Sequence, residues 1–358
     1  MEFQQFCVLL LKHILMRKTV FILGMLCGSH SLVAQQFTAI YNADSSLTGF
    51  ENSRSKVSIA PQFVQVAGNK FDHIVAVTKE DKQGKWHSYY LTSGSRKVGS
   101  DSMYMFDNTF DCENEGFIRF TDWKTGKTGV FNRDGKIVVP AVYNAVSSVM
   151  NGMVIALQGA EKVKDGEHFF WKGGKDLLID TANKVLVADF NAAEDLNMYS
   201  LQLENQPGTD TTRMSFKGVN GKYYTFQVYK KEFSEWLYRD LLPGLTKEKL
   251  AKHSFSKITY YNGEDWVSDD KALFIDKYWD FLQARFKDVA AFNIVSGNFN
   301  PFIFEGPLYD KYINHCFTAK DWQYPSISIF FEGSNEKGQL DFIRTDEGYQ
   351  LIGVGFAR

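Results

Sequence analysis

Short runs of alternating apolar and polar residues, separated by turns, dominate the first half of the chain. The clearest example reads as three strands, over residues 117–120, 128–132 and 136–139. An Asp-Gly pair at residues 134–135 is a strong signal for a hairpin turn, and Pro140 is expected to end the third strand. This pattern predicts an antiparallel β-meander.

A similar arrangement recurs on both sides of this stretch. A turn glycine followed by lysine lies at Gly84, Gly126 and Gly174, at spacings of 42 and 48 residues, and a partial unit precedes them at residues 48–63. Such self-similarity is typical of small units that stack on one another to bury their apolar faces. The sequence therefore predicts a β-rich repeat domain over residues 35–190.

These residues resemble the WG repeat, also called the KWG repeat, whose unit contains Gly-Lys-Trp-Gly, an apolar strand, a Gly-Lys turn and a Val-Ile-Pro-Pro segment. Lys85-Trp86 keeps the lysine and the tryptophan together, with His87 in place of the glycine. Gly129 keeps the glycine, and residues 136–140 match the second half of a unit. The resemblance covers about residues 45–190 and implies three or four antiparallel β units. It also implies a binding or scaffolding module without catalytic residues.

A connecting region follows over residues 191–257. Two predicted strands flank an Asn-Gly turn at residues 220–221, and residues 232–241 place apolar side chains on one face of a helix. Thr246 is positioned to cap a further short helix.

Residues 258–358 predict an α+β domain in which a helix precedes an antiparallel meander. Ser268 is positioned to cap a long helix, whose apolar face includes Leu273 and Trp279. Core packing is the expected role of Trp279. The three strands predicted after this helix span residues 326–332, 339–344 and 349–356.

Residues 1–34 have the layout of a bacterial secretory signal peptide. Arg17 and Lys18 form a positive segment, residues 20–27 form a compact apolar core, and the stretch ends in Leu-Val-Ala, which suits a signal peptidase. Met16 is an alternative start that shortens the signal. We expect an exported protein, periplasmic or extracellular and compatible with outer-membrane association. A transmembrane segment is not expected in the mature chain, because the apolar run is shorter than the roughly 20 residues that span a bilayer.

Two cysteines, Cys112 and Cys316, remain outside the signal. The chain is large enough to fold without disulfides, so two buried free thiols are the default expectation. A disulfide between domains is the alternative, which an oxidising compartment permits.

Composition and charge narrow the function classes. The chain has 31 Phe, 17 Tyr and 7 Trp, and such side chains favour the half-buried surface of a β-sheet. The formal net charge is −2, and no basic run occurs outside the signal. Nucleic-acid binding depends on clustered lysines and arginines, so we exclude a nucleic-acid partner.

The chain offers no recognisable catalytic, cofactor or metal motif. Its histidines, cysteines and carboxylates lack zinc-ligand spacing, and no phosphate loop, dinucleotide fingerprint or nucleophile elbow is present. We therefore assign no catalytic residue, no cofactor and no metal. Aromatic side chains in polar, loop-like sequence are the candidate ligand contacts, because exposed rings can stack on sugars or peptides. These residues are Tyr309, Trp322 and Tyr324.

Three hypotheses for function follow. The preferred one is a non-enzymatic binding or scaffolding protein of the bacterial cell envelope, which presents its β-repeat surface to a protein or glycan. The alternative is a hydrolase or lyase with an active site in the C-terminal domain, where His315 or His253 would lie beside Asp310. The third is a structural assembly element of the envelope.

Overall fold

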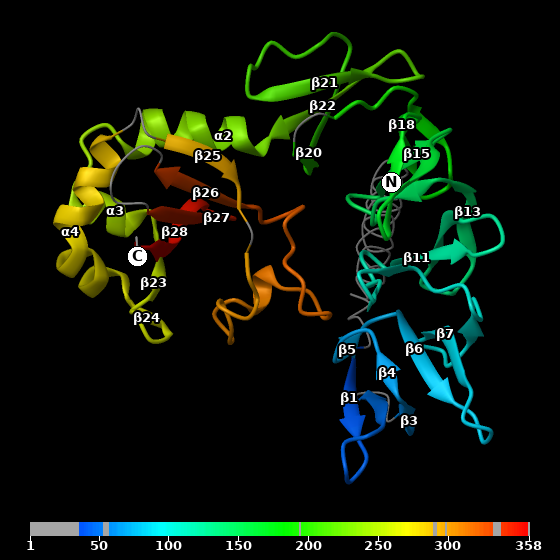
Figure 1. The fold of residues 1–358 in the computed structure, drawn as a ribbon. Coiled ribbons are helices and arrows are strands. Elements are labelled where there is room, and N and C mark those ends of the chain that lie inside the picture. Colours follow the sequence, from blue (N-terminus) through cyan, green and yellow to red (C-terminus); the bar gives the residue numbers. More distant parts are fainter. Residues whose placement is uncertain are drawn as a thin grey trace, which may run out of the picture. The chain divides into compact units, whose positions relative to one another are not determined.

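The computed structural model describes residues 36–52, 57–192, 195–288, 292–297, 299–331 and 338–356. The predicted signal peptide and most of the predicted turn at residues 333–338 lie outside these ranges. The described chain is strand-rich and contains many antiparallel sheets (Figure 1). Its helices include none long and apolar enough to cross a membrane.

Four antiparallel sheets follow one another along residues 37–187, as expected for short strands joined by turns. The first, ordered β3-β2-β1-β5, contains β1 (Phe37–Tyr41), β2 (Thr48–Asn52), β3 (Val57–Phe63) and β5 (Lys70–Phe71). The second, ordered β4-β6-β7-β8, contains β4 (Gln65–Val66), β6 (Ile74–Glu80), β7 (Trp86–Thr92) and β8 (Lys97–Val98). The third contains β11 (Phe117–Asp122), β12 (Lys127–Asn132) and β13 (Ile137–Tyr143). The fourth, ordered β14-β15-β18-β19, contains β14 (Ala145–Val146), β15 (Met153–Gln158), β18 (Lys175–Asp180) and β19 (Val185–Val187).

Two further hairpins form small sheets of their own. They are β9 (Met105–Phe106) with β10 (Thr109–Phe110), and β16 (Glu161–Asp165) with β17 (His168–Lys172).

The same five-residue loop joins the last two strands of the second, third and fourth sheets. In each loop a side-chain oxygen of the first residue accepts the backbone N–H of the fifth, at 3.1, 2.9 and 2.8 Å. The fourth residue has a positive φ, which turns the chain back on itself. The first residues are Thr92, Asn132 and Asp180, at spacings of 40 and 48 residues. The fourth residues are Ser95, Gly135 and Asn183.

Pro140 does not end its strand, contrary to the prediction. β13 continues through it to Tyr143, although the pairing with β12 is irregular between Val139 and Tyr143. β13 is an edge strand of its sheet, and an edge tolerates a residue without a backbone N–H.

Neighbouring sheets share buried apolar side chains. Tyr90 of β7 packs against Phe131 of β12, with ring centroids 5.5 Å apart. Val139 of β13 and Val154 of β15 belong to one buried cluster. Each of these sheets therefore covers an apolar face that its neighbour would otherwise expose.

The connecting region follows its predicted order. β20 (Leu196–Glu204), β21 (Arg213–Lys217) and β22 (Tyr223–Val228) form an antiparallel sheet in the order β20-β22-β21. α2 (Tyr229–Trp236) begins earlier than predicted and continues as a π-helical turn, η1 (Leu237–Leu241). Thr246 caps α3 (Lys247–Lys252) by accepting the Lys249 N–H, as predicted.

The last sheet has six strands in the order β24-β23-β28-β27-β26-β25. β23 was not predicted, and it pairs with β28 in parallel, so this sheet is mixed. The sheet's elements are β23 (Ser254–Tyr261), β24 (Trp266–Asp270), β25 (Phe292–Ser296), β26 (Ser326–Phe331), β27 (Gln339–Thr345) and β28 (Gly348–Gly355). A short 3-10 turn, η3 (Asp310–Tyr312), lies in the connection between β25 and β26.

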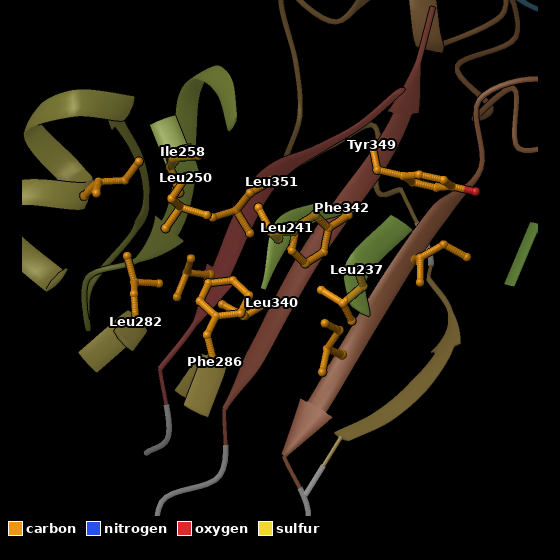
Figure 2. Packing of buried hydrophobic residues seen from close by; sticks show 14 of the residues in the cluster. Leu237, Leu241, Leu250, Ile258, Leu282, Phe286, Leu340, Phe342, Tyr349 and Leu351 are labelled. Carbon is orange, nitrogen blue, oxygen red and sulfur yellow. The ribbon is translucent and has the colours of Figure 1, made fainter. Parts of the chain in front are cut away.

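α4 (Lys271–Lys287) is the predicted long helix, but its cap is Asp270, which accepts the Ala272 N–H at 2.9 Å. Ser268 instead lies in β24 and hydrogen-bonds with Thr259. Leu273 was predicted on the apolar face and is 70% exposed. Figure 2 shows the buried cluster in which strand residues of β27 and β28 meet side chains of the helices. Labelled members include Leu237, Leu241, Leu250, Leu282, Phe286, Leu340, Phe342 and Leu351.

Cys112 and Cys316 form a disulfide, so the expectation of two free thiols is wrong. The bond joins residues 204 positions apart, with their Cα atoms 6.0 Å from each other. It connects the stretch before β11 to the connection between β25 and β26. Sequence spacing cannot reveal such a long-range contact, because it arises only when the two halves fold together.

Candidate ligand-binding site

A pocket of about 490 Å³ lies where separate stretches of the chain meet. Residues from β15, β20, β25 and the segment before β26 line it, together with Tyr229 at the start of α2. The pocket therefore forms only when these distant segments of the chain fold together. Its polar and aromatic lining residues are Asp195, Tyr229, Ser296, Asp321, Trp322 and Ser326.

Trp322, one of the predicted ligand contacts, is half-buried in the wall of this pocket. Its carbonyl accepts the Tyr229 hydroxyl at 2.8 Å, and its side chain lies near the hydroxyl of Tyr199. The Tyr199 hydroxyl in turn donates to Glu115 at 2.6 Å. Glu115 is anchored by the backbone N–H of Gly152. The backbone of Trp322 is thus held in place by Tyr229.

Two carboxylates face the same pocket. Asp195 accepts a hydrogen bond from the Ser296 hydroxyl. Asp321 lies at the surface, but many protein atoms surround its carboxyl group and partly desolvate it. This desolvation, followed by the negative charge of Asp195, raises the pKa of Asp321 to about 6. Among the described residues, no lysine or arginine forms an ion pair with Asp321. The carboxylate of Asp321 can therefore accept hydrogen bonds from a ligand in this pocket.

The raised pKa of Asp321 predicts how stability changes with pH. The folded chain binds a proton at this site up to about pH 6, whereas the unfolded chain releases it near its ordinary value of 3.8. Stability contributed by this group therefore falls as the pH rises from about 4 to about 6. Asp321→Asn should be more stable than the parent above this window, by no more than about 1 kcal/mol because solvent screens a partly exposed charge.

Urea unfolding at several pH values checks this expectation. Asp195→Asn should shift the window to lower pH, since it removes the charge that opposes ionisation of Asp321. A parent and an Asp321→Asn variant with the same pH dependence would contradict the assignment.

A second pocket, of about 870 Å³, adjoins the first and shares Ala192, Asp195 and Ser296 with it. One side is formed by α2 and η1, which contribute Lys230, Lys231, Arg239 and the acidic Glu235 that pairs with Arg239. Asp195 and Ser296 thus line both pockets.

The two other predicted contact residues, Tyr309 and Tyr324, are not exposed. They are 4% and 8% accessible and belong to one buried aromatic cluster. Tyr309 stacks on Phe255 with centroids 5.3 Å apart, and Tyr324 meets Tyr312 edge-on at 5.1 Å. The prediction of an exposed ring was wrong for both, because the connection between β25 and β26 builds an apolar core of its own.

Neither His315 nor His253 pairs with Asp310 in the described part of the chain. His315 Nε2 lies 3.6 Å from Asp72 Oδ2. The ring of His253 packs against Trp236, and burial followed by the charges of nearby lysines lowers the pKa of His253. The histidine–Asp310 arrangement expected for a hydrolase or lyase is therefore not formed.

A pocket of about 340 Å³ beside the disulfide gathers two histidine–carboxylate pairs. The imidazole of His73 hydrogen-bonds with Glu113 at 2.6 Å, and His315 faces Asp72. Glu113 also accepts the backbone N–H groups of His73 and Ile74, each at 3.0 Å. Since one oxygen of Glu113 holds two backbone N–H groups and the other holds the His73 imidazole, we regard this pair as structural.

Sequence reasoning missed Asp195, Tyr229, Ser296 and Asp321. Only Asp321 carried a signal, because it directly precedes Trp322. Within the described ranges, no three histidine, cysteine or carboxylate residues are grouped so that they could hold a metal ion.

Comparison with known proteins gives no family assignment. No protein-family model matches the chain, and no curated protein is significantly similar to it.

Proposed function

We propose that this chain is an exported, non-enzymatic binding protein of the bacterial cell envelope that holds a glycan in the Trp322 pocket. The observation that carries this proposal is a half-buried indole, on a backbone held by Tyr229, beside the carboxylate of Asp321, which has no cationic partner among the described residues. The C–H face of a sugar ring packs on an aromatic ring, while its hydroxyl groups donate to carboxylates. Pockets that combine an apolar wall with a few convergent polar groups suit such ligands.

Export and the domain assignments belong to the same proposal. The Cys112–Cys316 disulfide supports a destination in an oxidising compartment, since stable disulfides are rare in the cytosol. The recurring five-residue loops support a stack of WG-like repeats over residues 35–190. The sheet that contains β23–β28, with α4 packed beside it, supports an α+β domain at the C-terminus. In this reading the repeats act as the scaffold that holds the pocket.

A glycan array followed by calorimetry tests the proposed function. Trp322→Ala should weaken binding of the selected glycan by about 2 kcal/mol, or about thirtyfold, because a central tryptophan contact is lost. Asp321→Asn should weaken it as well, and binding by the parent should decline as the pH falls below about 6. The matched control is Trp266→Ala, which removes a 52% exposed tryptophan of β24 outside this pocket.

The outcomes separate binding from catalysis. Glycan binding that survives Trp322→Ala, or an array without any hit, would count against the proposal. The second candidate function is a hydrolase, which the pairing of Asp321 with Asp195 favours, because a carboxyl group with a raised pKa can act as a general acid. Cleavage of the bound glycan that disappears in Asp321→Asn would establish that candidate instead.

A further inference from the structure

The β16–β17 hairpin is an arm outside the buried clusters that the described residues form. Among the described strands, its two strands pair only with each other, from Glu161 opposite Lys172 to Asp165 opposite His168. The strands that it interrupts, β15 and β18, pair directly with each other as far as Gln158 and Lys175. The arm is therefore an insertion that extends a complete hairpin, and the fourth sheet does not need it for its core.

The base of the arm is held by hydrogen bonds to Asn144, although the two strands of the arm form a sheet of their own. The side chain of Asn144 accepts the Ala160 N–H at 3.1 Å and donates to the Ala160 carbonyl at 2.8 Å. Gly174 has a φ of +84°, and a Cβ atom there would lie 2.8 Å from the Gln158 carbonyl. The local backbone thus specifies where the arm leaves the sheet.

Three consecutive aromatic residues occupy the second strand of the arm. Phe169 is 56% exposed, Phe170 is 48% exposed, and Trp171 is half-buried. None of them belongs to a buried apolar cluster formed by the described residues. A grouped set of exposed rings without a role in folding marks a surface for a partner.

The register of the hairpin places positive charge beside these rings. Lys162 lies opposite Trp171, and Lys164 lies opposite Phe169, so these four side chains share one face. The Lys162 ammonium is 4.5 Å from the Phe169 centroid and 6.0 Å from that of Trp171. The acidic strand residues, Glu161 and Asp165, alternate onto the opposite face.

We propose that this arm docks on the surface of an anionic phospholipid bilayer. A bilayer offers phosphate groups for Lys162 and Lys164 directly above an apolar layer that receives the rings. Phe170 projects from the opposite face, which also carries Glu161 and Asp165, so the face of Phe169 and Trp171 is the one that meets the bilayer. Phenylalanine rings have no hydrogen-bonding group, which favours lipid over a polar partner. No other described strand pairs with the outer edges of the two strands, so the arm rests in the hydrated interface and does not span the membrane.

Vesicle flotation with the protein isolated from producing cells tests this inference independently of the Trp322 pocket. Vesicles of phosphatidylglycerol mixed with phosphatidylcholine should bind the protein, whereas vesicles of phosphatidylcholine alone should bind it weakly. Each of Lys162→Gln and Lys164→Gln should lower the association constant about fivefold, and added salt should reduce binding. The double variant Phe169→Ser, Trp171→Ser should lower it by about tenfold or more.

The matched control is Trp123→Ser with Lys124→Gln, an exposed tryptophan–lysine pair in the turn between β11 and β12. Its binding should stay within about twofold of the parent. Unchanged thermal unfolding midpoints in all variants would show that the fold is intact. The inference is overturned by equal binding to both vesicle types, by hairpin variants that bind like the parent, or by equal losses in the control. Binding to dextran sulfate in place of vesicles would also overturn it, by identifying a soluble polyanion as the partner.

Discussion

Replacing both cysteines in the variant Cys112→Ser, Cys316→Ser should lower the free energy of unfolding by about 2–5 kcal/mol. The disulfide joins positions 204 residues apart, so it removes much of the conformational freedom of the unfolded chain. Breaking it restores that freedom, while the contacts of the folded state stay largely the same. The expected result is a lower denaturant midpoint with little change in strand content by circular dichroism.

Reductant supplies the control for this prediction. Dithiothreitol should lower the stability of the parent to the level of the double variant and should leave the variant itself unchanged. Mass spectrometry should first show that the reductant has freed both thiols of the parent. If the reduced parent then unfolds at the same denaturant concentration as the oxidised parent, the prediction is contradicted. The same comparison would show how much the fold depends on an oxidising compartment.

The strands of the first half could be predicted because their signals are local. Side chains alternate with a period of two, and the turns use residues that tolerate a positive φ, such as Gly135. Thr246 could be predicted as a cap for the same reason, since its partner is only three residues away. The prediction for Pro140 was wrong because an edge strand can contain a proline. Which strand lies at an edge depends on the order of strands in the sheet, and the local sequence does not reveal that order.

The candidate site could be predicted only in part because its members come from distant segments. Trp322 was recognised from its polar surroundings, but Asp195 lies more than a hundred residues away and reaches the same pocket through the pairing of whole sheets. Tyr309 and Tyr324 have similarly polar neighbours and are buried. A polar sequence therefore indicates a connection between strands, but it does not indicate whether that connection packs a core of its own.

Arg119→Met should destabilise the chain by about 3–5 kcal/mol, because it leaves a buried carboxylate without its counter-ion. The partner is Asp111, whose side chain is 5% exposed, against 20% for Arg119. Arg119 Nε lies 3.1 Å from Asp111 Oδ2, and the guanidinium lies 4.1 Å from the centroid of the Tyr104 ring. Arg119 also donates to the Val146 carbonyl, which connects the third sheet to β14 of the fourth. Urea unfolding of the parent and the variant measures the loss.

A double-mutant cycle separates the cost of the unpaired Asp111 carboxylate from the cost of the lost Arg119 contacts. Adding Asp111→Leu to Arg119→Met should recover most of the loss, since an apolar pair can replace a buried ion pair with little change in stability. Arg239→Met is the matched control, because Arg239 is 76% exposed and pairs with Glu235 one helical turn away. That substitution should cost less than about 0.5 kcal/mol. If the double variant were as unstable as Arg119→Met alone, the loss would come from the missing arginine contacts and not from the unpaired carboxylate of Asp111.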